Sequence, residues 1–311
     1  MSFSNAKIIG TGLSRTAYPD GKRERGDPLR SISQSDLQVI IRNPHKWRFT
    51  QDGDDEQTEA MKFGSLVDYL LFTPAKFAED YAVKPETYTD AKTGEVKPWR
   101  ANAGPCVTWL EEHEGANVIS EKQLVKARKA IKALQADADV AAVLTGAQFQ
   151  SIIVADYTAR NGLVIPVCGL TDIIHPGLAI ADLKTFSDAS ADGWGRRVFR
   201  DMLHFQGAFY LDIYNATPDG IKAPLTTFLH IAVEPVEPFE IGRRQVSEEL
   251  LSIGRGQYKQ ALDLYAECIK SGQWKGYDEP GCWTMADAEP WMMMQTGKAA
   301  MRDQFAELCG Q

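Results

Sequence analysis

The stretch GLTDIIHPGLAIADLKTF, residues 169–186, consists of two apolar runs separated by a His-Pro-Gly turn at residues 175–177. Asp172 lies on the first run, and Asp182 and Lys184 lie on the second. Apolar runs bounded by such a turn predict two strands. Side chains two residues apart on a strand point to the same face, so Asp182 and Lys184 project together. The short turn can fold Asp172 back beside them.

Three charges on apolar strands require an explanation, because burying an unpaired charge costs several kcal/mol. A divalent cation would relieve the repulsion between two carboxylates, and Mg²⁺ prefers oxygen ligands. A lysine beside such a metal can orient or help to deprotonate an attacking water. The alternative is a structural Asp182–Lys184 ion pair at a sheet edge, with Asp172 solvated independently.

The rest of the chain predicts an α/β fold. Helical patterns occupy about residues 58–72, 120–144, 189–215 and 246–270. Four strand-like runs accompany them: QSIIVADYT, GLVIPVCGLTDIIH, LAIADLKTF and LTTFLHIAVE. We expect a mixed β-sheet flanked by helices. Residues 1–30 read as an irregular N-terminal arm and 31–311 as a single domain, with core motifs at 58–215 and a C-terminal strand, helix and tail at 225–311.

Composition narrows the class of protein. The net charge is −8 and the sequence pI about 5.3, which argues against a protein that merely coats nucleic acid but not against a nuclease. The five cysteines form no C-x-x-C pair, so neither a zinc site nor a disulfide framework is indicated. No run of 18 apolar residues and no signal-peptide core are present. We therefore expect a cytoplasmic protein without a membrane partner.

Four short motifs follow one another along the chain. They are G-x-x-x-D ending at Asp68, G-x-x-D ending at Asp172, D-L-K-T from Asp182, and Q-x-x-x-Y from Gln206 to Tyr210. Their order resembles the PD-(D/E)XK nuclease superfamily, and within it the RecE-type (exonuclease VIII-like) phage exonuclease domain. The segments SISQSDLQVIIRNPHKW, FGSLVDYLLFTPAKFAEDY and IADLKTFSDAS support the narrower match. The resemblance covers roughly residues 31–270.

The resemblance implies a restriction-endonuclease-like core and a set of site residues. Metal ligands would be Asp172, Asp182 and the backbone carbonyl of Leu183, with Lys184 activating water or stabilising the transition state. By the same resemblance, Gln206 and Tyr210 would help to position the substrate strand.

Two positions depart from the family pattern. RecE-like sequences usually have histidine where this chain has Asp68; aspartate can still ligate Mg²⁺, so Asp68 is kept as a metal ligand. Gln150 stands where the family's strand is expected to begin with glutamate, and that position is left unassigned.

The activity implied by the resemblance is that of a DNA exonuclease that uses Mg²⁺, with Mn²⁺ as a substitute. It would resect duplex DNA ends 5′ to 3′ for a single-strand-annealing partner, as a homo-oligomeric ring, in a bacterial or phage-infected cell. One alternative is a repair or defence nuclease acting on single strands, flaps or internal sites. Another is a catalytically silent protein that binds DNA ends.

A group of aromatic and basic residues precedes the glutamine helix. It comprises Trp194, Arg196, Arg197 and Arg200. Such a mixture suits contacts with DNA phosphates and bases. Helix packing with a solvated basic face is the alternative.

Overall fold

The computed structural model describes residues 3–14, 17–19, 23–50, 58–278, 281 and 283. The chain divides into two compact units, Met1–Trp274 and Lys275–Gln311. Most of the second unit, and with it most of the predicted C-terminal tail, lies outside the described residues. The first unit contains every motif of the predicted site.

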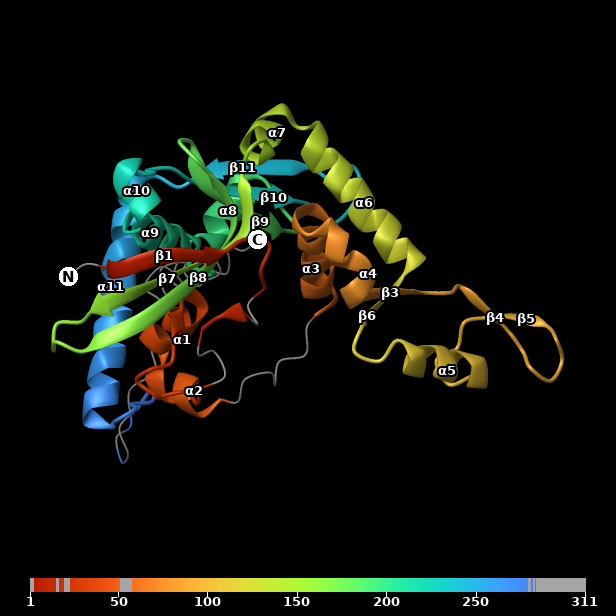
Figure 1. Ribbon diagram of the computed structural model, residues 1–311, viewed down its shortest axis with the longest axis horizontal. Helices are drawn as coiled ribbons and strands as arrows, with labels where there is room; N and C mark the ends of the chain where they lie inside the picture. Colours follow the sequence, from red (N-terminus) through yellow and green to blue (C-terminus); the bar gives the residue numbers. More distant parts are fainter. Residues whose placement is uncertain are drawn as a thin grey trace, which may run out of the picture. The chain divides into compact units, whose positions relative to one another are not determined.

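A mixed sheet forms the centre of the first unit (Figure 1). Among the described residues its strand order is β1-β7-β8-β9-β10-β11, with β2 paired to β8. The β9–β10 and β2–β8 pairs are parallel and the others antiparallel. The strands are β1 (Phe3–Gly10), β2 (Ile32–Ser33), β7 (Gln148–Thr158), β8 (Val164–His175), β9 (Ala179–Thr185), β10 (Phe228–Val233) and β11 (Ile241–Gln245).

Helices cover both faces of this sheet. The helices of the described residues, including α5 of the extension described below, are α1 (Gln34–Arg42), α2 (Pro44–Phe49), α3 (Glu59–Phe72), α4 (Phe77–Asp80), α5 (Gly104–Glu112), α6 (Glu121–Ala136), α7 (Ala138–Leu144), α8 (Ala191–Arg197), α9 (Leu203–Asn215), α10 (Pro218–Lys222) and α11 (Glu248–Ser271), with a 3-10 turn at Pro74–Lys76. One buried cluster joins the sheet to α1, α9 and α11. A second joins its other face to α3, α6 and α7. The predicted α/β fold with a flanked mixed sheet is confirmed.

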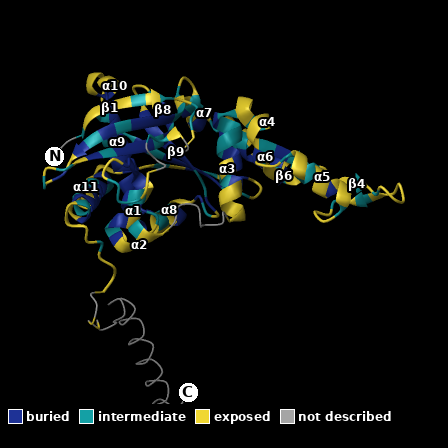
Figure 2. Cartoon of the chain, turned by 60° about the horizontal axis from the view of Figure 1, so that its bottom comes forward, coloured by how far each residue is buried: buried dark blue, intermediate teal, exposed yellow. Residues whose placement is uncertain are grey.

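A smaller extension lies between α4 and α6. It contains the parallel pair β3 (Tyr81–Lys84) and β6 (Asn117–Ser120), the antiparallel pair β4 (Thr87–Thr89) and β5 (Val96–Pro98), and α5. Figure 2 shows that its outer part is mostly exposed, whereas buried residues line the central sheet. The extension therefore adds surface to the fold more than core.

The expectation of an irregular N-terminal arm is wrong for β1. This strand pairs with β7 along the sheet edge, and Phe3 packs against Tyr157 and Tyr258 with ring centroids 5.6 and 5.8 Å apart. Because β1 is an edge strand with register shifts, its exposed residues do not alternate cleanly with buried ones. That weak alternation explains why sequence reasoning missed it.

Candidate active site

The predicted site lies where β8 and β9 separate. Their pairing ends at Ile173 and Ala181. Beyond this point, the backbone N–H of Leu183 donates a hydrogen bond to the carboxylate of Asp172, with N and Oδ2 2.9 Å apart. The Asp172 side chain thus replaces a backbone partner that β8 would otherwise supply. Since the N–H and C=O of one strand residue point to the same edge, the Leu183 carbonyl faces this opening too.

Asp182, Lys184 and Gln206 form a compact polar cluster next to that opening. The Lys184 Nζ lies 2.6 Å from Asp182 Oδ2 in an ion pair. On the other side, Gln206 Nε2 donates to Asp182 Oδ1 at 2.7 Å. Asp182 is 4% and Gln206 8% exposed, so both groups act at low local dielectric. The shared face of Asp182 and Lys184, predicted from strand alternation, is confirmed.

Burial and three carboxylates determine the charge state of Lys184. Burial lowers the pKa of its ammonium, but the carboxylates of Asp182, Asp172 and Asp68 raise that pKa more strongly, and the net pKa lies above the ordinary value. Lys184 is therefore a cation at neutral pH in the metal-free protein. The same interactions show that Asp68 acts electrostatically on the cluster although it lies on a different element.

Gln150, left unassigned from the sequence, lies beside Asp172. Phe149 pairs with Ile173 and Ser151 with Thr171, so Gln150 stands directly opposite Asp172 across the β7–β8 ladder. Gln150 Nε2 donates to Asp172 Oδ1 at 3.4 Å. Its φ of 47° is uncommon for a residue with a side chain, and such conformations cluster at functional sites.

A buried histidine extends the polar row across the sheet. In the β9–β10 register His230 pairs with Asp182, and in the β10–β11 register it pairs with Arg244. His230 is fully buried, and among the described residues neither ring nitrogen has a hydrogen-bond partner. Burial lowers its pKa to about 4, against a weaker upward effect of Asp182. The imidazole is therefore neutral near pH 7. Sequence reasoning missed His230, because only the register of two distant segments reveals it.

Asp68 approaches the cluster from α3, on the opposite face of the sheet. A cavity of about 470 Å³ has Asp68, Asp172 and Gln150 in its lining. A tight contact holds α3 there: a Cβ on Gly64 would lie 2.8 Å from Thr185 Oγ1. The first glycine of G-x-x-x-D is thus needed for the close approach of α3 to β9.

Tyr210 shares α9 with Gln206 but makes different contacts. Its ring packs on Gly169, where an added Cβ would lie 2.8 Å from Tyr210 Cε1, and it lies 6.4 Å from the Phe228 ring between centroids. Tyr210 is 5% exposed. These contacts anchor α9 on β8 and β10, and so fix the helix that carries Gln206.

The four residues chosen as DNA contacts do not lie on the glutamine helix. Trp194, Arg196 and Arg197 belong to α8, and Arg200 lies in the linker before α9. Met202, with φ 51°, separates the two helices, so the single helix expected at 189–215 is wrong.

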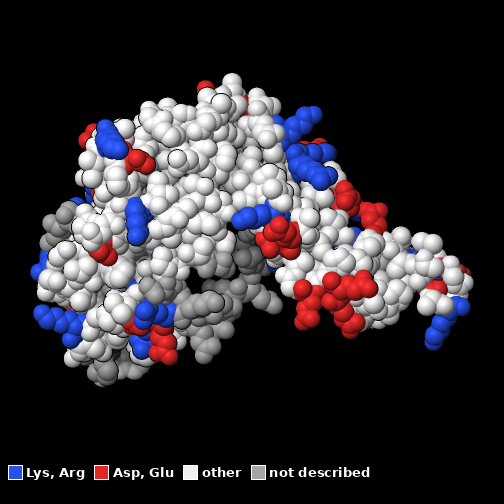
Figure 3. All heavy atoms as spheres, in the orientation of Figure 1, with Lys and Arg blue, Asp and Glu red and all other residues white. Residues whose placement is uncertain are grey.

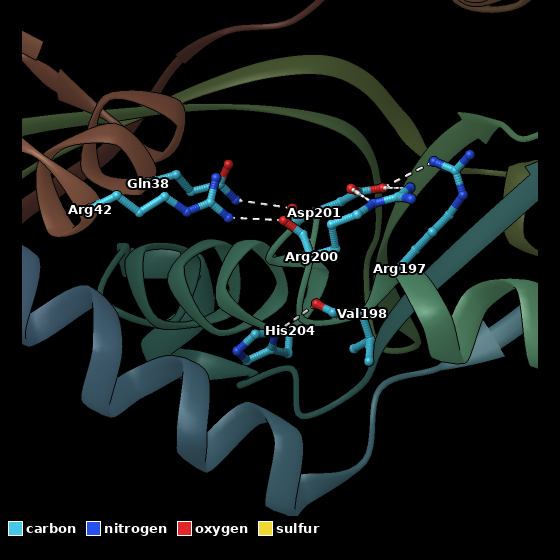
Figure 4. Close-up of polar contacts among 7 residues, drawn as sticks. All are labelled: Gln38, Arg42, Arg197, Val198, Arg200, Asp201 and His204. Carbon is cyan, nitrogen blue, oxygen red and sulfur yellow. Dashed lines mark hydrogen bonds and ion pairs between the residues drawn. The ribbon is translucent and has the colours of Figure 1, made fainter. Parts of the chain in front are cut away.

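Contacts from α1 hold this linker in place. Arg42 Nη2 donates to the Arg200 carbonyl at 2.9 Å, and Gln38 Nε2 donates to the Asp201 carbonyl at 3.4 Å (Figure 4). Gln38 Nε2 also lies within hydrogen-bond distance of the Met202 carbonyl, at 3.3 Å.

The arginines of this region are paired with carboxylates. Arg197 and Arg200 both bind Asp201, at 3.0 and 2.8 Å, and Arg196 binds Asp188. Trp194 packs against two buried clusters. On the face shown in Figure 3, lysines and arginines are spread over several places instead of forming one basic band.

The oxygen atoms of the cluster are ligands of the kind that a hard divalent cation prefers. Asp172, Asp182 and the Leu183 carbonyl present oxygens at the opening, which is the ligand chemistry of Mg²⁺. Within the described ranges no three His, Cys, Asp or Glu side chains are grouped closely enough to hold a metal. The reason is visible: Asp182 is drawn to Lys184 and Gln206, while Asp172 is drawn to Leu183 and Gln150.

Comparison with known proteins agrees with this geometry. The family described as "PDDEXK-like domain of unknown function (DUF3799)" matches residues 31–282. The chain belongs to this family. The match contains all four sequence motifs and confirms the resemblance to PD-(D/E)XK proteins, and with the fold it supports a nuclease. PDDEXK-like nucleases generally use divalent metals. No curated protein matches the chain.

A solved structure shares the fold of this chain. A "putative exonuclease" from Eubacterium rectale is 16% identical, with 93% of this chain and 100% of that chain covered at a TM-score of 0.53. A phage-related exonuclease from Haemophilus somnus 129PT is 13% identical, with 79% and 97% covered at a TM-score of 0.33. Every helix in the described part of this PDDEXK-like chain is too short or too polar to cross a membrane.

Proposed function

We propose that this PDDEXK-like protein is a metal-dependent DNA exonuclease. The observation that carries the proposal is the buried Asp182–Lys184–Gln206 cluster beside Asp172, at the point where β8 and β9 separate. A structural ion pair alone would not need a second carboxylate held across the opening. Nor would it explain a neutral polar side chain bonded to each aspartate.

The proposed metal ligands are Asp172, Asp182 and the Leu183 carbonyl, with Asp68 facing them from α3. The proposed ion is Mg²⁺, with Mn²⁺ as a substitute. When bound, a divalent cation supplies Lewis acidity toward the phosphate and lowers the pKa of water. A bound cation would compete for Asp172 and Asp182 with the hydrogen-bond donors that now hold them, among which are a backbone N–H, two amides and a lysine.

Lys184 and Gln206 would act on the reacting groups. Hydrolysis joins a water oxygen to phosphorus and breaks one phosphorus–oxygen bond, while a proton passes to the leaving oxygen. Lys184, held as a cation, would donate a hydrogen bond to the attacking water or to the phosphate oxygen on which charge develops. Gln206 would keep the orientation of Asp182, and Tyr210 would keep α9 in register with the sheet.

The proposed substrate is linear duplex DNA, resected from 5′ to 3′. The RecE-type motifs support this choice, as does the fold shared with the putative exonuclease from Eubacterium rectale. The remaining 3′ single strand would pass to a single-strand-annealing protein, and a homo-oligomeric ring would keep the enzyme on its substrate. The proposed phosphate contacts are Arg196, Arg197 and Arg200. These arginines would leave their present ion-pair partners, Asp188 and Asp201, and bind DNA phosphates instead. The proposed setting is the cytoplasm of a bacterial or phage-infected cell.

Digestion of end-labelled linear duplex DNA tests the proposal. Wild-type protein is incubated with 5′-labelled, 3′-labelled and covalently closed circular DNA in Mg²⁺, Mn²⁺ or EDTA. We expect early release of the 5′ label in either metal, no release in EDTA and intact circles. Asp182→Asn, which keeps the size of the side chain, should release about 1,000-fold less label.

Other outcomes point to other functions. Cleavage of circles or flaps would favour a repair or defence nuclease. Equal label release by wild type and Asp182→Asn would exclude this site as the source of any activity. Binding of DNA ends without shortening them would favour a catalytically silent end-binding protein.

A further inference from the structure

A second cavity adjoins the candidate site along α3. It has a volume of about 450 Å³ and is lined by α3, β3 and residues 116–123. Ser65 lines both this cavity and the one that contains Asp68 and Asp172. We call the second cavity the α3 groove and define it by Lys62, Ser65, Tyr81, Asn117 and Gln123.

Ser65 of α3 connects the two cavities. Lys62, Ser65 and Asp68 are spaced three residues apart, so Ser65 neighbours both of the others on the helix surface, and Lys62 and Asp68 lie about 120° apart around the axis. At 1.5 Å per residue, Lys62 lies about 9 Å along the axis from Asp68. A stacked strand advances about 3.4 Å per nucleotide, so this distance spans two to three nucleotides. A phosphate held at Asp68 would therefore have neighbours at the level of Lys62.

The groove differs from the site in charge. The site cavity has Asp68, Asp80 and Asp172 in its lining, which suits a cation. The described lining of the α3 groove has lysine as its charged residue and includes no carboxylate, although the whole chain carries a net charge of −8. Glu59 lies at the rim of the groove, where Lys62 and Gln123 both contact its carboxylate. A groove with fewer carboxylates than the site beside it fits a polyanion whose reacting phosphate lies at the acidic end.

Side chains of the groove are suited to nucleotides. Tyr81 stacks on Phe77 with centroids 5.3 Å apart and meets Tyr69 edge-on at 5.0 Å. Burial and then the charges of Asp68 and Asp80 raise the pKa of Tyr81, which places its hydroxyl within electrostatic reach of the site.

Lys62 is free to exchange its present partner. It is paired with Glu59 at 3.0 Å, and both side chains are more than half exposed. Such a pair contributes little to stability, so exchange of Glu59 for a phosphate is inexpensive.

We propose that the α3 groove binds the nucleotides next to the scissile phosphate, as a single DNA strand. Lys62 and Ser65 contact the phosphates, and Tyr81 contacts a base or sugar. This inference rests on the proposed nuclease function for the position of the scissile phosphate. It adds a binding subsite with its own residues, which can be tested by binding alone.

The test measures both binding and cleavage. Fluorescence anisotropy of a labelled 12-nucleotide DNA strand in Ca²⁺ gives Kd, and label release in Mg²⁺ gives kcat and KM. Lys62→Gln should raise Kd and KM about threefold to tenfold, leave kcat unchanged and reduce the salt dependence of binding by about one phosphate contact. Lys270→Gln is the matched control, because it removes the same charge from an exposed position on α11 and should change neither constant.

Tyr81 provides the second variant. Tyr81→Leu should raise Kd about tenfold through lost stacking, and Tyr81→Phe should restore most of the binding. Thermal unfolding of each variant shows whether a loss of DNA binding comes from misfolding. If Tyr81→Leu is misfolded, the result for Lys62→Gln decides whether the groove binds DNA. These effects should disappear with a dinucleotide, which is too short to occupy both the site and the groove.

The possible results separate the two proposals. If wild type cleaves DNA and Lys62→Gln behaves like Lys270→Gln in Kd and KM, the groove assignment is wrong and the nuclease stands. If both groove variants bind DNA more weakly but wild type does not cleave it, the groove assignment stands and the nuclease proposal is wrong. An RNA strand that binds more tightly than DNA would overturn the choice of DNA.

Discussion

The two sides of the candidate site differ in how far they are buried. On the α9 side, Asp182 and Gln206 are 4% and 8% exposed, and His230 is fully buried. On the α3 side, Asp68 and Ser65 line open cavities. The Gln206–Asp182 hydrogen bond and the Asp182–Lys184 ion pair hold the α9 side together, while the ring nitrogens of His230 have no hydrogen-bond partner among the described residues. The α3 side leaves room for substrate. Under the proposed function, the buried side would carry the chemistry and the open side would recognise the substrate.

Breaking the buried ion pair should have the largest effect. Asp182→Ala removes the ion-pair partner of Lys184 and a proposed metal ligand together. We expect nuclease activity to fall by about 1,000-fold or more. The free energy of unfolding should drop by on the order of 3 kcal/mol, because a largely buried cation loses its nearest counter-charge. Urea denaturation followed by circular dichroism measures that loss.

The double variant Asp182→Ala/Lys184→Met is the control for this prediction. With the uncompensated charge gone, it should recover most of the stability but none of the activity. A double variant as unstable as Asp182→Ala would show that packing around Asp182, and not the charge of Lys184, causes the loss.

His230 should destabilise the metal-free protein under acid conditions. Its folded-state pKa of about 4 lies below the ordinary value of 6.5. The folded protein therefore binds fewer protons than the unfolded chain between these pH values, and stability falls as the pH is lowered from about 6.5 to 4. At about 1.4 kcal/mol per pKa unit, the loss reaches roughly 3 kcal/mol. Burial is the main cause of this low pKa, with Asp182 raising it and Lys184 lowering it less strongly; Arg244 is the strand neighbour of His230 on β11.

The variant His230→Leu isolates this effect from the titration of carboxylates. It should be about 1 kcal/mol more stable than wild type at pH 7, because it removes a buried polar ring without partners. It should also show a smaller loss between pH 6.5 and 4. Equal pH profiles for the two proteins would mean that His230 is protonated in the folded state.

Local sequence patterns identified the motifs on both sides of the candidate site, but not the distant residues that contact them. Strand alternation placed Asp182 and Lys184 together. The four-residue spacing of the Q-x-x-x-Y motif agrees with the position of Gln206 and Tyr210 on α9. These features depend on residues within a few positions of each other, where periodicity is informative.

Non-local pairing produced the features that sequence reasoning missed. Gln150 reaches Asp172, and His230 reaches Asp182, only because distant strands pair in one register. The break between α8 and α9 occurs at Met202 without a glycine or proline to mark it. There the long-range bonds from Gln38 and Arg42 to linker carbonyls override local helix propensity.

Substitution of Asp68 should have the smallest effect, because Asp68 lines the open cavity on the α3 side of the site. Asp68→His introduces the residue that the resemblance leads one to expect, and Asp68→Asn removes the charge with little change in size. If Asp68 is a ligand, Asp68→Asn should raise the Mg²⁺ concentration for half-maximal activity about tenfold, whereas Asp68→His should retain activity. Asp80→Asn is the matched control, since Asp80 lines the same cavity without being a proposed ligand. Equal Mg²⁺ requirements for Asp68→Asn, Asp80→Asn and wild type would remove Asp68 from the metal site and leave the open side with recognition alone.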